Sequence, residues 1–319
     1  MSPGSKPNNP KRGFQPPASR HAALNLRAGI IRAIRKFLDE LDFLEVETPI
    51  LISAPAPERH IEPIPASGGF LHTSPELCMK RLLAAGYQRI YQITRCFRAG
   101  ERGRLHLPEF TMLEWYHAGI DYRELMRECR MLVQSVFMEC GKADSIHFAG
   151  HTIKLDGQWE TLSVAEAFER WAPITLEQAL LAETFDLVMV EHIEPQLGTR
   201  TPSFIYNYPI SMGSLARPCP DNPMLAERFE FYIGGLELAN GFSELTDQHE
   251  QRKRFRNDIA NRKGSEKSSS PMPERFLASL KFMPEAAGIA LGVDRLVMVL
   301  GDYSEIDEVV AFTPEEVKD

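Results

Sequence analysis

Apolar residues recur at helical spacing near the start of the chain and at alternating spacing further on. In residues 19–42 an apolar side chain returns every three or four positions, which predicts a long amphipathic helix with Ser19 as its N-cap. Residues 1–18 are rich in Pro, Asn, Lys and Gly and predict a disordered tail. The pattern therefore predicts one folded domain over residues 19–319.

Strand patterns and further helical patterns follow the first helix. Residues 43–51 (FLEVETPIL) predict a short strand that stops at Pro49, and a proline-rich connector follows it. Residues 141–200 carry no recognisable chemistry, and their short hairpin and helical patterns predict a helical insertion. The later helices are expected over residues 71–86, 121–140, 163–171 and 176–198.

The stretch RIYQITRCFRAGERGRLHLPEFTMLEWY (residues 89–116) predicts two strands joined by a charged, glycine-bearing loop that suits a mobile lid over an anion. Side chains alternate sides along a strand, so one face would collect polar groups while Tyr91, Ile93 and Phe97 point into a core. An arginine, an aromatic ring and a carboxylate beside a phenol suit a phosphate, a flat base and an ammonium group. An ordinary half-buried hairpin with solvated charges fits this stretch equally well. The expected site face holds Gln92, Thr94, Cys96, Arg98, Phe110, Met112, Glu114 and Tyr116.

The Gly-Gly pair at residues 234–235 predicts a two-residue hairpin turn between two alternating runs. With that turn Tyr232 opposes Glu237 and Glu230 opposes Ala239, so these four side chains would share one face. Neighbouring carboxylates repel each other unless a hard cation lies between them, and Mg²⁺ favours carboxylate and phosphate oxygens. The pair of glutamates predicts either a magnesium site or two solvated side chains.

Three other segments leave alternatives open. The C-terminal pattern predicts a glycine-spaced strand and then a helix that begins at Asp294 and Arg295, where glycine would let the backbone approach a ligand. Glu76 either faces a pocket or complements the dipole of its own helix. The basic helix over residues 248–263 predicts a solvated face, with attraction of an acidic partner as the alternative.

Composition and charge narrow the possible functions. The 319 residues, 43% hydrophobic and 25% charged, describe a globular protein, and the net charge of −8 argues against a general nucleic-acid coat. No apolar run approaches the ~20 residues of a membrane span, and no secretory signal is expected. Five scattered cysteines, none in CxxC spacing, fit a reducing cytoplasm without a zinc site. P-loop and dinucleotide-binding motifs are absent, so an ATP site here would depend on arginines.

Three segments resemble the motifs of class II aminoacyl-tRNA synthetases. The first helix with residues 46–49 resembles motif 1, FRAGERGRLHLPEFTMLEWY (97–116) resembles motif 2, and GIALGVDRL (288–296) resembles motif 3. Within that class TSPEL, PEFTMLEWY, ELANGFSELTD and GVDR are most similar to lysyl-tRNA synthetases. The resemblance implies an α+β fold, with a class II synthetase-like antiparallel sheet flanked by helices, and a homodimer formed through motif 1.

The same resemblance assigns residues to ATP. Arg98 would hold the α-phosphate and the substrate carboxylate, Phe110 would stack on adenine, and Arg295 would clamp the γ-phosphate. Arg98 and Arg295 are therefore the expected catalytic residues. The expected ATP-binding residues are Arg98, His106, Phe110, Glu237, Leu238, Gly292 and Arg295.

A metal pair and an amino-acid pocket are implied in the same way. Glu230 and Glu237 match the metal-binding glutamates of the family. Ala290 stands where lysyl-tRNA synthetases usually carry glycine, and its methyl group would favour β-lysine over α-lysine. The expected pocket, whose carboxylates would receive two ammonium groups, consists of Ser74, Glu76, Glu114, Tyr116, Asn240, Glu244 and Ala290.

Lysyl-tRNA synthetases carry an OB-fold anticodon-binding domain ahead of the catalytic domain, whereas about twenty residues precede motif 1 here. The chain resembles instead the stand-alone paralogues that lysylate elongation factor P. We therefore expect ATP- and Mg²⁺-dependent activation of (R)-β-lysine or lysine and transfer to a lysine of elongation factor P, with no anticodon binding. The alternatives are a minimal ligase acting on tRNA or a small molecule, and a non-catalytic module that senses lysine or nucleotide.

Overall fold

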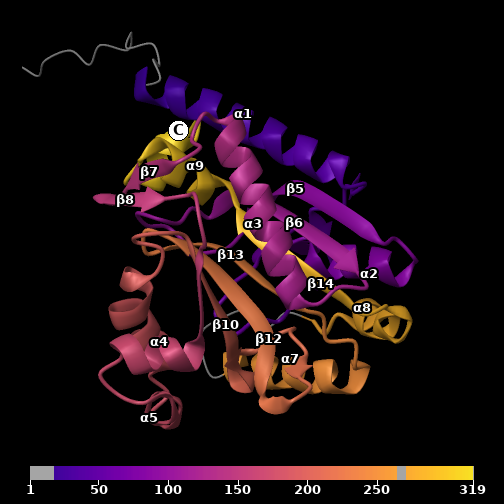
Figure 1. The fold of residues 1–319 in the computed structure, drawn as a ribbon. Helices are drawn as coiled ribbons and strands as arrows, with labels where there is room; N and C mark the ends of the chain where they lie inside the picture. Colours follow the sequence, from indigo (N-terminus) through magenta and orange to yellow (C-terminus); the bar gives the residue numbers. More distant parts are fainter. Residues whose placement is uncertain (1–17, 264–270, 319) are drawn as a thin grey trace, which may run out of the picture.

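A nine-stranded sheet organises the chain (Figure 1). The computed structural model describes residues 18–263 and 271–318, so the predicted tail lies outside the described residues except for Ala18, which begins the first helix. The expected antiparallel sheet flanked by helices is confirmed, with parallel pairs at its two edges, β1–β5 and β9–β10. In order across the sheet the strands are β1 (Leu44–Glu45), β5 (Arg89–Phe97), β6 (Glu109–Ala118), β14 (Ala286–Gly292), β13 (Leu236–Ser243), β12 (Asn222–Ile233), β10 (Ser203–Pro209) and β9 (Glu160–Ser163), with β11 (Pro218–Cys219) paired to β12.

Two smaller sheets and a set of helices surround the main sheet. One small sheet has the order β2 (Leu51–Ile52), β4 (Gly69–Leu71), β3 (Ile64–Ala66), and the other pairs β7 (Ser145–Phe148) with β8 (His151–Lys154). The α-helices are α1 (Ala18–Glu40), α2 (Glu76–Ala84), α3 (Tyr122–Glu139), α4 (Val164–Trp171), α5 (Leu176–Leu181), α6 (Phe185–Val188), α7 (Gln248–Lys263), α8 (Glu274–Ser279) and α9 (Val293–Gly301). The tighter or wider turns are the π-helix η1 (Met189–Ile193) and the 3₁₀ turns η2 (Glu194–Gln196), η3 (Ile210–Met212), η4 (Leu280–Phe282) and η5 (Ile306–Val309). Within the described ranges no helix combines the length and the apolar character that crossing a membrane requires.

One face of the main sheet is covered by α1, α3 and α9, and Figure 1 shows α1 and α3 side by side over it. Helix α3 begins where predicted because Asp121 accepts hydrogen bonds from backbone N–H groups of its first turn, and Glu124 completes a capping box. The hairpin residues Tyr91 and Trp115 are buried in this core, with Ile93 packed against it. The predicted division of the hairpin into a core face and a second face is confirmed for Tyr91 and Ile93, whereas Phe97 is half-buried and is not part of this core.

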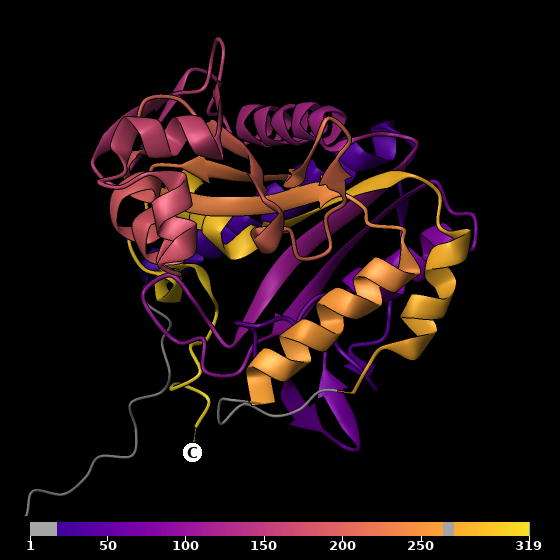
Figure 2. The same ribbon diagram turned by 90° about the horizontal axis from the view of Figure 1, so that it is seen from below.

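The opposite face carries two separate apolar clusters. Helices α2, α7 and α8 pack over Ile90 and Tyr116 at one end, and α4, α6 and η1 pack over Ile205 and Tyr232 at the other. Figure 2 shows α7 and α8 on one side of the molecule and the helical segments 164–196 at the far edge. The strip of sheet between these clusters is left for polar side chains.

The turn at residues 234–235 has the predicted form, since both glycines have positive φ, 59° and 76°. Tyr232 opposes Glu237 as expected, but a β-bulge shifts the register after this pair. Phe231 therefore opposes Ala239, and Glu230 opposes Asn240. The placement of Ala239 on the polar face was wrong, because the extra residue in β13 turns its side chain into the core.

Several predicted boundaries near the N-terminus differ from the structure. Helix α1 already includes Ala18, so Ser19 lies inside the helix and is not its cap. Of residues 43–51 only Leu44–Glu45 pair with the main sheet, because the chain leaves it before Pro49. The connector after them contributes β3 and β4, which the proline-rich composition did not indicate.

The segment 141–200 is less helical than predicted. The hairpin β7–β8 and helix α4 are present as expected, but residues 176–198 are divided into α5, α6, η1 and η2. Glu183 adopts a left-handed φ of 54° between α5 and α6, which ends the first of them. Residues Glu160–Ser163 join the main sheet as β9, so part of this segment belongs to the central sheet.

Candidate active site

One row of side chains crosses five strands between the two apolar clusters. The register pairs Gln92 with Glu114, Glu114 with Ala290, Ala290 with Asn240, and Asn240 with Glu230. Directly opposed residues share a face of the sheet, so these five side chains form a continuous strip. The strip brings together residues that are up to 198 positions apart in the sequence, Gln92 and Ala290, and forms the floor of the candidate site.

Arg98 and Phe110 lie beside this floor, at the loop end of the β5–β6 hairpin. The Arg98 guanidinium lies over the Phe110 ring, 5.0 Å from its centroid, and its Nη1 is 3.8 Å from Glu101. The Nε of Arg98 is buried without a hydrogen-bond partner. A buried donor without an acceptor is costly, so an anionic ligand at this position would satisfy it.

Arg295 approaches from the first turn of α9 and meets two other predicted residues. Its Nη1 donates to the Glu237 carbonyl at 2.8 Å and lies 3.5 Å from the Glu237 carboxylate, and its Nη2 donates to His106 Nε2 at 2.6 Å. Burial, and then Arg295 and Arg98, lowers the pKa of His106 to about 4, so this ring is a neutral acceptor. A Cβ on Gly292 would meet nothing closer than the Arg295 side chain at 3.7 Å, which leaves room for a ligand.

The two glutamates expected to hold a metal lie close enough to repel each other. The pKa of Glu237 is raised by burial and by Glu230. Both oxygens of Glu230 are already engaged, with Arg228 on one, and with Tyr208 OH at 2.5 Å and Tyr232 OH at 2.6 Å on the other. In the part of the chain that the structure describes, no group of three or more His, Cys, Asp or Glu is arranged to hold a metal. A cation here would therefore need oxygens from a ligand.

Glu194, which the sequence reasoning missed, brings a third carboxylate to this place. Burial, and then Glu230 and Glu237, raises the pKa of Glu194 to about 7. Its turn η2 follows the π-helix η1 and is fixed on the hairpin turn, because the Gly235 N–H donates to the Leu197 carbonyl at 2.8 Å. The segment that carried no recognisable chemistry thus supplies an acidic residue to the site.

Further along β6 from Phe110 lies a pocket of buried carboxyl groups. Glu114 is only 1% exposed, and its two oxygens accept hydrogen bonds from Ser74 Oγ at 2.6 Å and Tyr116 OH at 2.9 Å. Burial, and then Glu76, raises the pKa of Glu114 to about 8. Ser74 also accepts the Glu76 backbone N–H at 2.9 Å, which holds the start of α2 beside the pocket. These predicted pocket residues are in contact.

Lys80 is the main surprise of the pocket. Its Nζ lies 2.5 Å from Glu76 and 2.5 Å from Glu244, its side chain is 2% exposed, and it stands 4.9 Å from the centroid of the Phe242 ring. One protein ammonium group therefore already serves two of the predicted carboxylates. Burial nevertheless raises the pKa of Glu244 to about 8.

Small residues make space for these groups. A Cβ on Gly288 would come within 2.2 Å of the Tyr116 ring and 2.7 Å of a Glu244 oxygen, so only glycine fits under them. Ala290 follows two positions later, between Glu114 and Asn240. Glu58, from the loop after β2, also interacts with the pocket. Burial, and then Glu76, raises the pKa of Glu58 to about 7.

A buried set of hydrogen bonds joins β6, which carries Phe110, to α9, which carries Arg295. Asp294, next to Arg295, accepts the Thr111 backbone N–H at 2.6 Å, and Arg27 of α1 donates to the other Asp294 oxygen. Because Thr111 follows Phe110, these hydrogen bonds fix the ring and Arg295 relative to each other. The sequence suggested Asp294 only as the start of a helix.

Two further predicted positions make no polar contact at the floor. Leu238 lies at the bulge and is buried in the core, so only its backbone could contact ATP. Cys96 is buried on the floor side, and burial raises the pKa of its thiol well above the usual value, as expected for a small apolar residue.

Known proteins resemble this chain over nearly its whole length. The family model for class II tRNA synthetases (D, K and N) matches residues 17–316. A protein from Proteus mirabilis named elongation factor P–(R)-β-lysine ligase is 42% identical over 94% of this chain and 97% of its own length. Proteins of the same name from Pectobacterium carotovorum and Vibrio cholerae are 41% and 40% identical, over 95% and 93% of this chain and 98% and 96% of their own lengths.

Proposed function

The chain belongs to the class II tRNA synthetase family of the D, K and N group, and from this membership we propose that it is an elongation factor P–(R)-β-lysine ligase. It activates (R)-β-lysine, or lysine, with ATP and transfers the aminoacyl group to a lysine side chain of elongation factor P. The names of the relatives and the arrangement of charges along the floor of the site support this function.

The buried carboxylate pocket is the observation that carries the proposal. Glu76, Glu114 and Glu244 lie together, and among the described residues Lys80 is the cation that contacts any of them. Buried carboxylates need positive partners, so the pocket favours a ligand with ammonium groups. Toward the β5–β6 loop, Arg98 and Arg295 favour phosphate and carboxylate groups. A diamino acid joined to a nucleotide phosphate matches this polarity.

The chain's residues would act on activation mainly by position and charge. Arg98 holds the amino-acid carboxylate beside the α-phosphate, and Arg295 holds the far end of the triphosphate, so that one carboxylate oxygen attacks phosphorus in line. The bond to pyrophosphate breaks as the aminoacyl adenylate forms. A carboxylate nucleophile needs no general base, so the neutral His106 would serve as the acceptor that orients Arg295.

The two hairpin carboxylates fit a divalent cation that is shared with ATP. Glu237 has a pKa raised by burial and by Glu230, and a cation between them would relieve this repulsion. When bound, Mg²⁺ would neutralise charge on the phosphate oxygens. Arg228 donates to Glu230 and orients it, so Glu237 is the freer of the two ligands.

We also propose a homodimer in the cytoplasm. Leu44, Ile50 and Leu51 are exposed beside a cleft of about 660 Å³ that Pro49 and Phe282 help to line, and apolar surface of this kind suits a second copy of the chain. All five cysteines are free thiols, as a reducing compartment would keep them.

Intact-mass measurement of elongation factor P tests the function directly. The protein is incubated with ATP, Mg²⁺ and labelled lysine or (R)-β-lysine, in the presence of bulk tRNA. We expect one aminoacyl addition to elongation factor P that survives RNase, with a preference for (R)-β-lysine. Label on tRNA with elongation factor P untouched would make the chain a tRNA ligase. Failure to exchange pyrophosphate into ATP would make it a non-catalytic binding module.

A further inference from the structure

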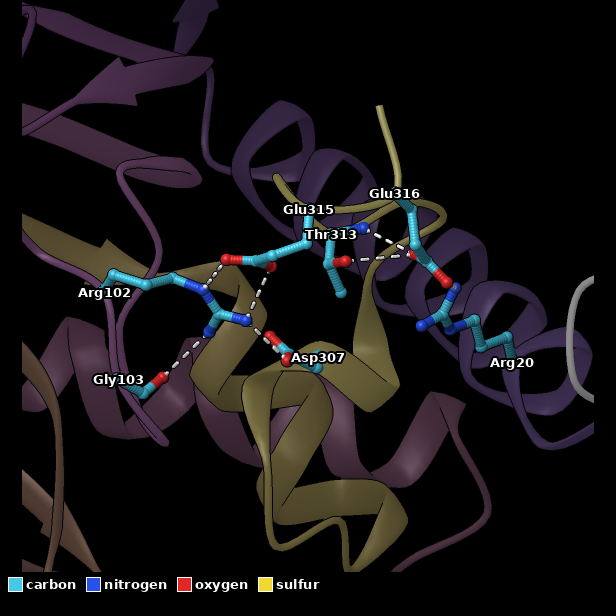
Figure 3. A network of polar contacts seen from close by, with 7 residues as sticks. All are labelled: Arg20, Arg102, Gly103, Asp307, Thr313, Glu315 and Glu316. Carbon is cyan, nitrogen blue, oxygen red and sulfur yellow. Dashed lines mark hydrogen bonds and ion pairs between the residues drawn. The ribbon is translucent and has the colours of Figure 1, made fainter. Parts of the chain in front are cut away.

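The loop between β5 and β6, residues 98–108, is held in place from its outer side. Arg102 forms two hydrogen bonds to Glu315, Nε–Oε1 at 3.0 Å and Nη2–Oε2 at 2.9 Å, and its Nη2 also donates to Asp307 at 2.7 Å (Figure 3). Arg104 adds a second connection, because its carbonyl accepts the Ile306 N–H at 2.9 Å. The loop that was expected to be a mobile lid is therefore anchored on this side by contacts within the chain.

Arg102 stands midway between the two residues of this loop that face the site. Arg98 lies four positions before it over Phe110, and His106 lies four positions after it against Arg295. Asp307 belongs to η5, soon after α9 ends, and α9 begins with the turn that carries Arg295. The loop is thus joined to α9 on the site side by His106, and to η5, which follows α9, on the outer side by Arg102.

The C-terminal segment that supplies Glu315 is itself fastened to α1. Arg20 donates to both oxygens of Glu316 at 2.8 and 2.9 Å, and Glu316 also accepts the Thr313 N–H at 2.8 Å. Figure 3 shows Glu315 and Glu316 pointing in opposite directions, one toward the loop and one toward α1. The segment therefore links the first helix of the fold to the loop.

We propose that Arg102, Asp307 and Glu315 form a latch that presets the loop for ATP, with Arg102 as a positioning residue that acts through Arg98 and His106. A two-pronged contact between a guanidinium and a carboxylate fixes orientation as well as distance, which a single exposed ion pair does not. A loop already in place loses less conformational freedom when it binds its ligand. Breaking the latch should weaken ATP binding more than amino-acid binding, since Arg98 touches both substrates whereas the residues expected around the ammonium groups lie outside the loop.

The inference rests on the proposed function for the identity of the nucleotide, and so two measurements are combined. Pyrophosphate exchange gives separate KM values for ATP and amino acid in Glu315→Gln, Arg102→Ala and the double variant. Hydrogen exchange of the loop amides in nucleotide-free protein reports the latch whether or not the enzyme is active. The matched control is Arg170→Ala, which removes a surface arginine–glutamate pair of 2.9 Å far from the loop.

We expect each single variant to raise the KM for ATP about threefold to tenfold, with a smaller rise in the KM for amino acid. The double variant should match Arg102→Ala, because every contact of the latch passes through the arginine, whereas Glu315→Gln leaves the bond from Arg102 to Asp307 and should have the smaller effect. Loop amides should exchange faster in Glu315→Gln and recover wild-type protection in saturating ATP. Unchanged loop exchange in Glu315→Gln, additive effects on KM, or an equal rise in both KM values would overturn the latch. Absent pyrophosphate exchange in wild type, with faster loop exchange in the variants, would leave the latch standing and refute only the ligase.

Discussion

Replacing Glu114 by Gln tests the amino-acid pocket at its most buried carboxyl group. Glu114 accepts hydrogen bonds from Ser74 and Tyr116 and has no cation of its own among the ion pairs of residues 18–263 and 271–318. A substrate ammonium group would therefore make a charge-assisted contact with it, which is worth about 1.5–3 kcal/mol. Glutamine keeps the size and loses the charge. We expect the KM for amino acid to rise about tenfold to a hundredfold, with the KM for ATP unchanged.

The raised pKa of Glu114 adds a pH dependence with a definite sign. With a pKa of about 8, about one pocket in ten holds the ionised carboxylate at pH 7 and about half do at pH 8. Because an ammonium group binds the ionised form, the wild-type KM for amino acid should fall about fivefold from pH 7 to pH 8. In Glu114→Gln this part of the change should disappear.

Protein stability should move in the opposite direction. A carboxyl group whose pKa is raised on folding stabilises the fold fully below its unfolded value of 4.5, and this contribution is lost as the pH rises to about 8 and beyond. Wild type should therefore lose about 1 kcal/mol more than Glu114→Gln in free energy of unfolding between pH 7 and pH 9.

The assay is pyrophosphate exchange at several pH values, with chemical denaturation in parallel. Glu109→Gln is the matched control, since Glu109 lies on the same strand, is 55% exposed and only approaches Arg95 at 3.7 Å. The reasoning is refuted if Glu114→Gln keeps the wild-type KM for amino acid at pH 8, or if Glu109→Gln reproduces its effect.

Three other substitutions address the remaining parts of the site. Arg98→Ala should lower pyrophosphate exchange about a hundredfold to a thousandfold with the fold intact, whereas Arg95→Ala, an exposed arginine of the same strand, should not; near-normal exchange by Arg98→Ala would remove its assignment. Glu237→Gln should raise the Mg²⁺ concentration needed for half-maximal exchange with little change in Tm, and an unchanged Mg²⁺ dependence would make Glu237 a mere surface carboxylate. Ala290→Gly should relax the preference for β-lysine toward α-lysine, because its methyl group lies between the strands that carry Glu114 and Asn240; an unchanged ratio of the two isomers would show that Ala290 is not the selector.

The sequence predicted the site best where strand periodicity alone decides the answer. Alternation in the first hairpin placed Glu114 and Tyr116 together and sent Tyr91 to the core, and the structure has the same division. The second hairpin could not be settled in this way. Leu238 and Ala239 are both apolar, so either of them can face the core and the pattern does not reveal which residue is the extra one in the bulge.

Long-range partners of charged residues were also beyond the sequence. Lys80 lies on a short helix between Met79 and Arg81, where a lysine normally indicates a solvated surface. Its i,i+4 spacing from Glu76 suggests a local pair, but Glu244 is 164 positions away and meets it only after the sheet has formed. Glu194 was missed for the same reason, since its neighbours at the site come from β12 and β13.

The basic helix α7 resembles a binding surface, but two of its arginines form bonds with other parts of the same chain. Arg252 pairs with Glu274 of α8, and Arg254 pairs with Glu250 and donates to the carbonyls of Ser214 and Ala216. These two cations are therefore committed to holding α7 against its neighbours. The expectation of a freely solvated face was wrong for them.

The bulge in β13 has a consequence for how such a site can change during evolution. Before Leu238 odd-numbered residues such as Glu237 face the floor. Beyond the bulge even-numbered residues such as Asn240 face it. Deleting one residue there would carry Asn240 into the apolar layer and bring Gly241 to the floor, while every substitution of Asn240 itself would leave its neighbours in place. Relatives that differ in substrate are therefore expected to differ in β13 by exchange of side chains at constant length, and insertions should accumulate outside this strand.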